Sequence, residues 1–162
     1  MELSVTSAMA GNVIPFPVPP PGESEVRAKP PKDVRVIVCG GPRTGKTTLA
    51  EKYRQLHPTL PVYSTDAFKG MDWSKASDAV VVWMEAFSGA WLIEGVASVR
   101  AIRKFLHRHP DRKPADVVFR LTRPFVELSP GQASMAKGEE TIWREVEPEL
   151  RRRGVQVKAV HQ

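Results

Sequence analysis

The stretch "CGGPRTGKTT", residues 39–48, decides how the rest of the sequence is interpreted. It contains the complete pattern G-x-x-x-x-G-K-[ST], in which Gly40, Gly45, Lys46 and Thr47 occupy the fixed positions. The apolar, β-branched run "VRVIVC" leads into it and favours a buried strand, and "GKTTLAEKYRQLH" continues it as a helix. A glycine-rich loop between a strand and a helix N-terminus is typical of a site for the phosphates of a nucleoside triphosphate.

Every residue of this loop is a candidate for contact with the nucleotide. Lys46 is expected to reach the β- and γ-phosphates, so we also predict a catalytic role for it, and the Thr47 hydroxyl is expected to ligate Mg²⁺. Cys39 ends the strand and is expected to be a small buried side chain. The predicted nucleotide-binding set is Gly40, Gly41, Pro42, Arg43, Thr44, Gly45, Lys46, Thr47 and Thr48.

Length, charge and cysteine content narrow the class of protein. The chain has 162 residues, enough for one domain with a real core, and a formal net charge of +6. That charge suits a protein that meets phosphates, but it does not establish nucleic-acid binding. The single cysteine excludes an internal disulfide and a zinc cluster. No apolar run reaches the length of a membrane span and the N-terminus lacks a secretory signal, so we expect a cytoplasmic protein without a membrane partner.

The first 32 residues differ in composition from the rest. Their stretch "GNVIPFPVPPPGESEVRAKPPKD" holds seven of the 15 prolines. Proline removes backbone donors and blocks helices and strand ladders, so residues 1–32 are expected to form a disordered tail. Such a tail is either a plain flexible leader or a docking peptide for a partner. The folded domain is expected over residues 33–162.

Strand-like and helix-like segments alternate along this domain. Alternation with short crossovers predicts a parallel sheet with helices on both faces. Residues 124–138 are expected to be a mobile connection, and Pro148 is expected to kink the last helix or divide it in two. The expected strands are 34–39, 61–65, 90–95, 115–122 and 155–160, and the expected helices are 45–57, 72–89, 98–109 and 139–154.

Two acidic side chains follow strands at the edge where ligands bind such sheets. Asp66 comes after the second strand, where it can accept the proton of an acceptor hydroxyl, bind Mg²⁺ through water, or cap the next helix. Glu94 ends the third strand, where it can hold a magnesium-bound water, touch the acceptor, or form a structural salt bridge. We predict Asp66 as a catalytic and acceptor-binding residue, Glu94 as acceptor-binding, and Glu94 with Thr47 at the metal.

Basic and aromatic side chains give weaker signals. Arg123, after the fourth strand, is expected to border the nucleotide, and Lys137 is expected to cover the transferring phosphate. Arg100 is close enough to the end of the third strand to face the acceptor. The basic region 100–113 is either a solvated helix face or a nucleic-acid footprint. Among the tryptophans, Trp83, Trp91 and Trp143 are expected in the core and Trp73 near the acceptor.

Four short segments together resemble the small P-loop kinases, a family that includes shikimate, gluconate, polynucleotide 5′- and nucleoside monophosphate kinases and chloramphenicol phosphotransferase. The segments are "GGPRTGKTT", "STDAF", "LIEG" and "LTRP", and the resemblance covers about residues 33–160. It implies an α/β P-loop NTPase fold, a three-layer sandwich with five parallel strands in the order 2-3-1-4-5. It also implies ATP and Mg²⁺ as cofactors, a lid at about residues 125–138, and Asp66 as the base for the acceptor hydroxyl.

The lid departs from the family pattern. Family lids usually carry arginines that grip the transferring phosphoryl group. The segment from Phe125 to Gly138 contains no arginine and one lysine. The alternatives in the sequence are Arg144, further along the chain, and Arg100.

The sequence therefore favours a Mg-ATP-dependent phosphotransferase that acts on a small hydroxyl-bearing or nucleotide acceptor. The main alternative is a P-loop ATPase coupled to a protein or nucleic-acid partner. The third is a nucleic-acid protein, either a polynucleotide 5′-kinase or a non-catalytic module that docks through its tail. A hydrolase normally shows Asp in the apolar strand where "WLIEG" has a lone Glu, and the domain leaves no room for a separate helical lid domain. The sequence names neither the acceptor nor the oligomeric state.

Overall fold

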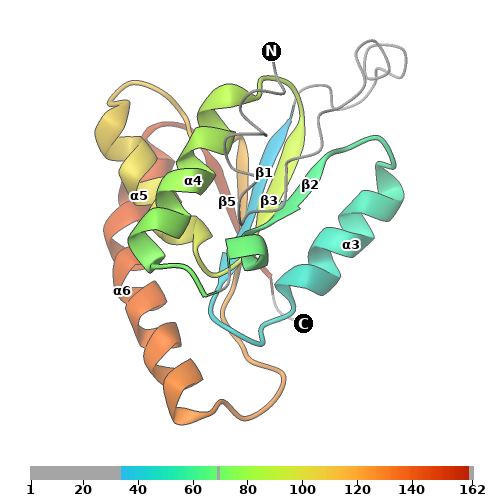
Figure 1. The fold of residues 1–162 in the computed structure, drawn as a ribbon. Helices are drawn as coiled ribbons and strands as arrows, with labels where there is room; N and C mark the ends of the chain where they lie inside the picture. The colour runs from blue at the N-terminus through green and yellow to red at the C-terminus, as the bar shows by residue number, and fades with distance from the viewer. Residues whose placement is uncertain (1–33, 69, 161–162) are drawn as a thin grey trace.

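The computed structural model describes residues 34–68 and 70–160 of the chain, so the predicted tail lies outside the described residues. Figure 1 shows the course of the chain, and its element labels are kept throughout. The elements are β1 (Arg35–Gly40), α3 (Lys46–Leu56), β2 (Val62–Ser64), the short 3-10 helix η1 (Thr65–Phe68), α4 (Trp73–Ala86), β3 (Trp91–Glu94), α5 (Ser98–Arg108), β4 (Val117–Leu121), α6 (Pro130–Arg152) and β5 (Gln156–Val160).

The five strands form one sheet in the order β2-β3-β1-β4-β5. All four neighbouring pairs are parallel, and in the central strand Val36 lies beside Leu92 of β3 and Val117 of β4. Parallel neighbours need long crossovers, which the helices provide. The structure thus confirms the parallel sheet predicted from the alternation and the strand order implied by the resemblance.

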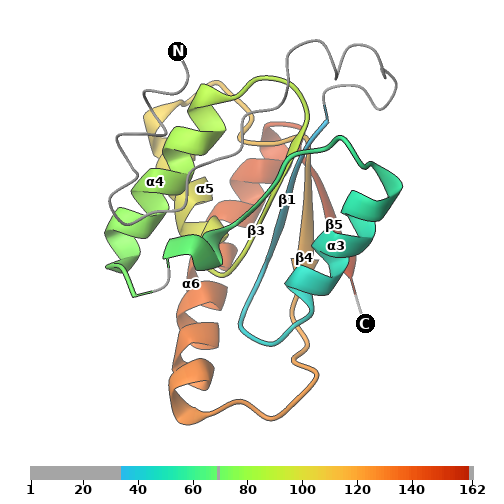
Figure 2. The same cartoon turned by 45° about the vertical axis from the view of Figure 1, so that its right-hand side comes forward.

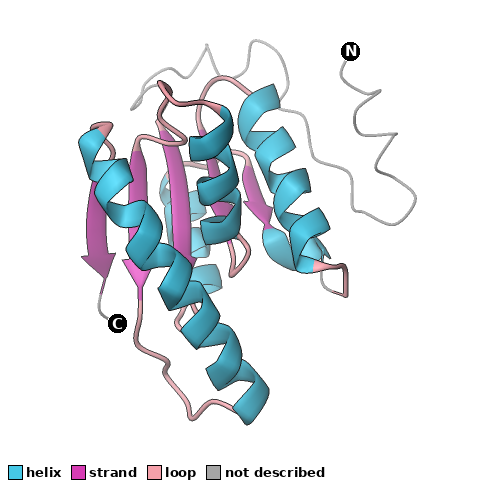
Figure 3. Ribbon diagram, turned by 90° about the vertical axis from the view of Figure 1, so that its left-hand side faces the viewer, coloured by secondary structure: helices cyan, strands magenta, loops and turns pink. Residues whose placement is uncertain are grey.

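Helices cover both faces of the sheet, as predicted. α3 packs on one face, and α4, α5 and α6 pack on the other (Figures 2 and 3). The larger apolar core lies under these three helices and includes Trp83, Trp91 and Trp143, the tryptophans expected there. Cys39 is fully buried in the same core, also as expected. The smaller core under α3 consists of Val36, Val38, Ala50, Leu92 and Leu121.

The start of α6 corrects the prediction for residues 124–138. The helix begins at Pro130, so its first turns occupy most of the segment that was expected to be a mobile connection. Ser129 forms a capping box with Gln132: its side chain accepts from the Gln132 backbone N–H, and the Gln132 side chain accepts from the Ser129 N–H. Proline at the first helical position is compatible with this cap because its missing N–H has no partner inside the helix.

Pro148 does not divide α6, contrary to one of the two expectations for it. The helix runs on to Arg152, and Val146 and Leu150 on either side of the proline are buried in the core. Pro148 itself is exposed, so water can bond the carbonyl group that the proline leaves unpaired. Although α6 has 23 residues, neither it nor any other helix in the described ranges is long and apolar enough to cross a membrane.

Candidate active site

The first glycine of the phosphate-binding loop, Gly40 at the end of β1, has no room for a side chain. Gly40 has a φ of 152°, and a Cβ atom there would lie 2.1 Å from the Leu121 carbonyl oxygen of β4. Inside the loop, the Thr44 hydroxyl donates to the Gly41 carbonyl at 3.0 Å, and the buried Lys46 Nζ donates to the same oxygen at 2.5 Å. The lysine ammonium is therefore held across the loop, beside the start of α3, and a helix N-terminus of this kind is a common place for phosphate groups in proteins.

Thr47 and Glu94 place two oxygens side by side next to the loop. The Thr47 hydroxyl donates to Glu94 Oε2 at 3.5 Å, and Glu94 is only 3% exposed. Burial raises the pKa of the Glu94 carboxyl and lowers the pKa of the Lys46 ammonium, each of which lies in the other's field. Hydroxyl and carboxylate oxygens are the ligands that Mg²⁺ prefers, so this pair fits a magnesium ion shared with phosphate oxygens.

A metal at this position would need the phosphates as further ligands. Within residues 34–68 and 70–160, no three His, Cys, Asp or Glu side chains gather in a way that could hold a metal ion. Mg²⁺ commonly uses one or two protein ligands together with substrate phosphates and water. Thr47 and Glu94 thus suffice only in the presence of the nucleotide.

Asp66 lies at the same edge of the sheet as Glu94. β2 pairs with β3 so that Ser64 is opposite Glu94, and Asp66 follows in η1 with its backbone N–H donating to Ser64 Oγ at 3.1 Å. The side chain is exposed. The N-cap of the following α-helix is Asp72, whose carboxylate accepts from the Ser74 N–H at 3.0 Å. The capping role considered for Asp66 is therefore filled by another aspartate.

One cavity of about 660 Å³ joins the loop to both carboxylates. Its lining combines polar and basic residues of the loop and the start of α3 with apolar side chains from η1, α4 and the segment after β3. The lining includes Pro42, Arg43, Gly45, Lys46, Thr47 and Thr48 from the loop, the carboxylates Asp66 and Glu94, and the apolar Phe68, Met71, Trp73, Val96 and Ala97.

Three cations predicted from the sequence lie outside the lining of this cavity. Arg123 is exposed in the connection after β4, and Lys137 is exposed on α6. Arg100 lines a second cavity of about 310 Å³, and its guanidinium carbon lies 5.8 Å from the centre of the Trp73 ring. Trp73 is 41% exposed and lines both cavities, as do Val96 and Met135, so the two cavities adjoin.

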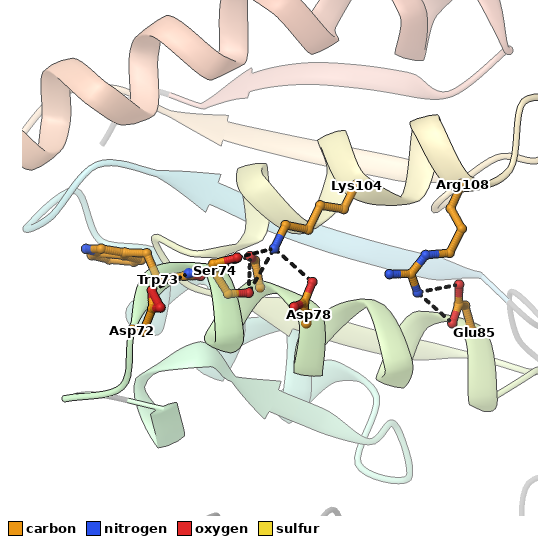
Figure 4. Close-up of polar contacts among 8 residues, drawn as sticks. Asp72, Trp73, Ser74, Asp78, Glu85, Lys104 and Arg108 are labelled. Carbon is orange, nitrogen blue, oxygen red and sulfur yellow. Dashed lines mark hydrogen bonds and ion pairs between the residues drawn. The ribbon is translucent and has the colours of Figure 1, made fainter.

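The other basic side chains of α5 are held by neighbouring helices. Figure 4 shows Lys104 pointing toward α4, where Nζ lies 2.8 Å from Asp78 Oδ1, and Arg108 pointing toward Glu85. Arg103 pairs with Glu145 of α6 at 3.2 Å. Three of the cations in the basic region 100–113 are thus paired with carboxylates of neighbouring helices, while the nucleic-acid footprint stays a prediction.

A buried ion pair between β4 and α6 was not anticipated. Arg120 is almost fully buried, pairs with the equally buried Glu139, and also lies 2.7 Å from Glu140. Its guanidinium carbon is 4.7 Å from the centre of the Trp143 ring. Burial raises the pKa of the neighbouring Cys39 thiol to about 12, so this cysteine stays protonated. A lone arginine in "VVFRL" gives no sign of its partner, which comes 19 residues later in the sequence.

These features define a P-loop fold of the kinase-like type. The class rests on the complete loop motif between β1 and α3 and on the parallel sheet in the order β2-β3-β1-β4-β5.

Comparisons with known proteins place this chain beside kinases only at the level of solved structures. No protein-family model matches it, and no curated protein matches it. A shikimate kinase from Acinetobacter baumannii, in complex with shikimate, is 12% identical over 80% of this chain and 84% of its own, with a TM-score of 0.49. A shikimate kinase from Bacteroides thetaiotaomicron is 11% identical over 79% and 85%, with a TM-score of 0.43. A possible uridine kinase from Bacillus stearothermophilus is 16% identical over 84% and 94%, with a TM-score of 0.41.

Proposed function

We propose that this protein is a Mg-ATP-dependent phosphotransferase that transfers the γ-phosphate to a small acceptor bearing a hydroxyl group. The observation that carries the proposal is the single cavity that joins the phosphate-binding loop, Asp66 and Glu94 to an apolar wall. A site for nucleotide hydrolysis needs space only for the triphosphate and one water. The room beyond Asp66, bounded by Phe68, Met71 and Trp73, is suited to a second substrate.

In this mechanism, the loop and α3 bind and orient the triphosphate. Backbone N–H groups of the loop and the N-terminus of α3 face the phosphates, and Lys46 supplies a positive charge beside them. Thr47 and Glu94 would hold Mg²⁺, which neutralises charge on the phosphate oxygens when it is bound. The burial of Lys46 and Glu94 strengthens these electrostatic contacts because little water screens them.

Asp66 acts on the acceptor. Its carboxylate is exposed and belongs to the lining of the cavity, so it can accept a hydrogen bond from the acceptor hydroxyl. As the acceptor oxygen bonds to the γ-phosphorus, the bond from that phosphorus to the β-phosphate oxygen breaks and the hydroxyl proton passes to Asp66. The products are the phosphorylated acceptor and ADP. Most of the rate would come from positioning and charge neutralisation.

The proposal is tested by looking for a phosphorylated product. The protein is incubated with Mg-ATP and a panel of nucleosides, nucleoside monophosphates, sugars, aromatic alcohols and 5′-hydroxyl oligonucleotides, and products are followed by mass. A mass gain of one phosphoryl group on an acceptor supports the proposal. ADP release with no phosphorylated acceptor would instead support the ATPase, and transfer restricted to oligonucleotides would identify a polynucleotide kinase.

The role of Asp66 is tested by Asp66→Asn, which keeps the size of the side chain and removes the base. Transfer should fall by roughly 100-fold or more, while binding of Mg-ATP stays intact. Asp72→Asn is the matched control, because Asp72 caps α4 and does not line the cavity, and asparagine is an equally good cap. Equal activity of the two variants would show that Asp66 is not the base.

A further inference from the structure

No lysine or arginine from the lid segment, residues 125–138, lines the cavity. Lys137 is exposed on α6, and its backbone carbonyl accepts from the Thr141 hydroxyl. Arg144, further along α6, is exposed and pairs with Glu140 at 3.1 Å. Among the described residues, the cations that line the cavity are Lys46 and Arg43, and both belong to the phosphate-binding loop.

Arg43 occupies this place at a cost in backbone conformation. Its φ of 60° is in the left-handed region, and it is the one residue other than glycine with a positive φ in the described ranges. A side chain with a Cβ atom is strained there, and glycine would be the unstrained choice. Strain of this kind at a ligand site suggests that the side chain performs a task.

The contacts that Arg43 makes within the chain do not account for the strain. Its guanidinium carbon lies 5.4 Å from the centre of the Phe125 ring, and Phe125 is 65% exposed. A cation–π contact at such an exposed site is weak. The Phe125 N–H also donates to the Arg43 carbonyl at 2.9 Å, but any residue at position 43 would supply that carbonyl. Arg43 forms no ion pair with another described residue, so its charge is available to a ligand.

The Arg43 guanidinium lies beside the connection that leads into α6. Phe125 lies in the connection between β4 and α6 and lines the cavity together with Arg43. The N-terminal half of α6 packs against the same loop, since a Cβ atom at Gly41 would lie 3.2 Å from the Ala136 Cβ. Figures 1 and 2 show this half of α6 extending beyond the carboxyl ends of the strands.

We propose that Arg43 is a catalytic residue that binds the terminal phosphate of the nucleotide from within the phosphate-binding loop, in place of a lid arginine. The inference rests on the proposed function and gives a catalytic role to a loop residue that the sequence predicted only as a nucleotide contact. The guanidinium would neutralise charge on the γ-phosphate, which a planar group with several N–H donors does better than a lysine. No bond forms or breaks at Arg43 itself.

The test uses Arg43→Gly, which removes the guanidinium and relieves the backbone. Affinities for Mg-ADP and for a non-hydrolysable Mg-ATP analogue are measured by calorimetry on the full chain. If Arg43 binds the terminal phosphate, the preference for the triphosphate over the diphosphate should fall at least about tenfold, because a charge-assisted hydrogen bond is lost. The melting temperature should stay equal or rise, which separates this loss from a folding defect. A variant with an unchanged preference overturns the proposal.

Two further variants distinguish a direct contact of Arg43 with the phosphate from effects of the lid. Phe125→Ala removes the ring but keeps the arginine, so it should lower the preference much less than Arg43→Gly does. If it lowers the preference as much as Arg43→Gly does, Arg43 acts only by holding the lid connection, and the proposal is wrong. If Lys137→Ala lowers the preference for the triphosphate and Arg43→Gly does not, the lid binds the terminal phosphate and the proposal is wrong. If the unaltered protein shows no preference for the triphosphate, the proposal is wrong as well.

The outcome is distinguishable from failure of the proposed function. If Arg43→Gly lowers the preference for the triphosphate but no acceptor is phosphorylated, Arg43 binds the terminal phosphate in a protein that is not a phosphotransferase. If acceptors are phosphorylated and Arg43→Gly leaves kcat unchanged, the function stands and the role of Arg43 falls. In an active phosphotransferase we expect kcat of this variant to fall about 100-fold or more.

Discussion

The basic residues of α5 and those of the phosphate-binding loop have different partners. On α5, Arg103, Lys104 and Arg108 each pair with a carboxylate of α4 or α6. In the loop, Lys46 donates to a backbone carbonyl, and Arg43 lies over an aromatic ring. Within the described residues, neither loop cation has an acidic side chain as an ion-pair partner.

This difference separates structural charge from charge that is available to a ligand. A lysine or arginine that the chain itself neutralises joins one helix to the next, whereas an unneutralised cation can bind a phosphate. The net charge of +6 includes both kinds. Removing a paired cation should therefore change stability, and removing an unpaired one should change ligand binding.

The largest loss of stability is expected at Arg120, the most deeply buried of the paired cations. Arg120→Met leaves Glu139 buried without its partner, which should lower the free energy of unfolding by about 3–5 kcal/mol. Chemical denaturation measures the loss. The double variant with Glu139→Gln should recover much of it, because the second change removes the buried charge. A double variant no more stable than the single one would contradict this account.

Lys46→Met should lower activity without lowering stability, which is the opposite of the effect expected for Arg120→Met. We expect the loss of this unpaired cation to lower kcat/KM for Mg-ATP by at least about 100-fold. Because burial lowers the pKa of Lys46, its charge is disfavoured in the folded state, and the variant should unfold at the same or a higher temperature. Measurements of turnover and of thermal unfolding check the expected loss of activity and the expected stability. A clear drop in melting temperature would place Lys46 with the structural cations.

Glu94→Gln tests the carboxylate that lies in the field of Lys46. The quantity measured is the pH dependence of stability. Burial raises the pKa of Glu94 in the folded state. The stability that the protonated Glu94 contributes is therefore fully present below the pKa of the unfolded state, and it is lost as the pH rises through the pKa of the folded state. The glutamine variant does not titrate there. It should therefore be more stable than the unaltered protein at pH 8, with the gain shrinking toward pH 4. Thermal unfolding across this range checks the sign, and a gain that grows toward pH 4 would contradict the assignment.

The smallest effect is expected at Lys104. Its side chain and that of Asp78 are partly exposed, so Lys104→Met should cost only about 0.2–1 kcal/mol of stability. Turnover and nucleotide affinity should not change. A measurable loss of nucleotide affinity would show that the paired cations of α5 also serve the ligand, and the distinction between the two sets would fail.

Much of the fold could be predicted from the sequence because each element has a local signal. Apolar runs mark the strands, and the glycine-rich motif marks the turn from β1 into α3. The start of α6 was missed because "SPGQ" contains a proline and a glycine, which usually interrupt structure. In the folded chain the same proline is compatible with the capping box of Ser129 and Gln132, and the helix begins there.

The candidate site could be predicted in part for similar reasons. Asp66 and Glu94 follow neighbouring strands, so topology brings them to one cavity with the loop, although their chemical roles stay predictions. Lys137 does not reach that cavity because α6 is helical there: Gln132 and Met135, three apart, face the cavity, and Lys137 falls on another face. The positive φ of Arg43 has no signature in a sequence, because it results from the closed loop as a whole.

The contact between Gly95 and Thr65 bears on how the site could change its substrate. A Cβ atom at Gly95 would lie 1.8 Å from the Thr65 hydroxyl oxygen, so the backbone just after β3 packs directly against the Thr65 side chain at the start of η1. Asp66 and Glu94 are the sequence neighbours of these two residues. In the proposed phosphotransferase, substitutions at Met71 or Trp73 would reshape the apolar wall of the cavity and leave this packing beside the two carboxylates in place.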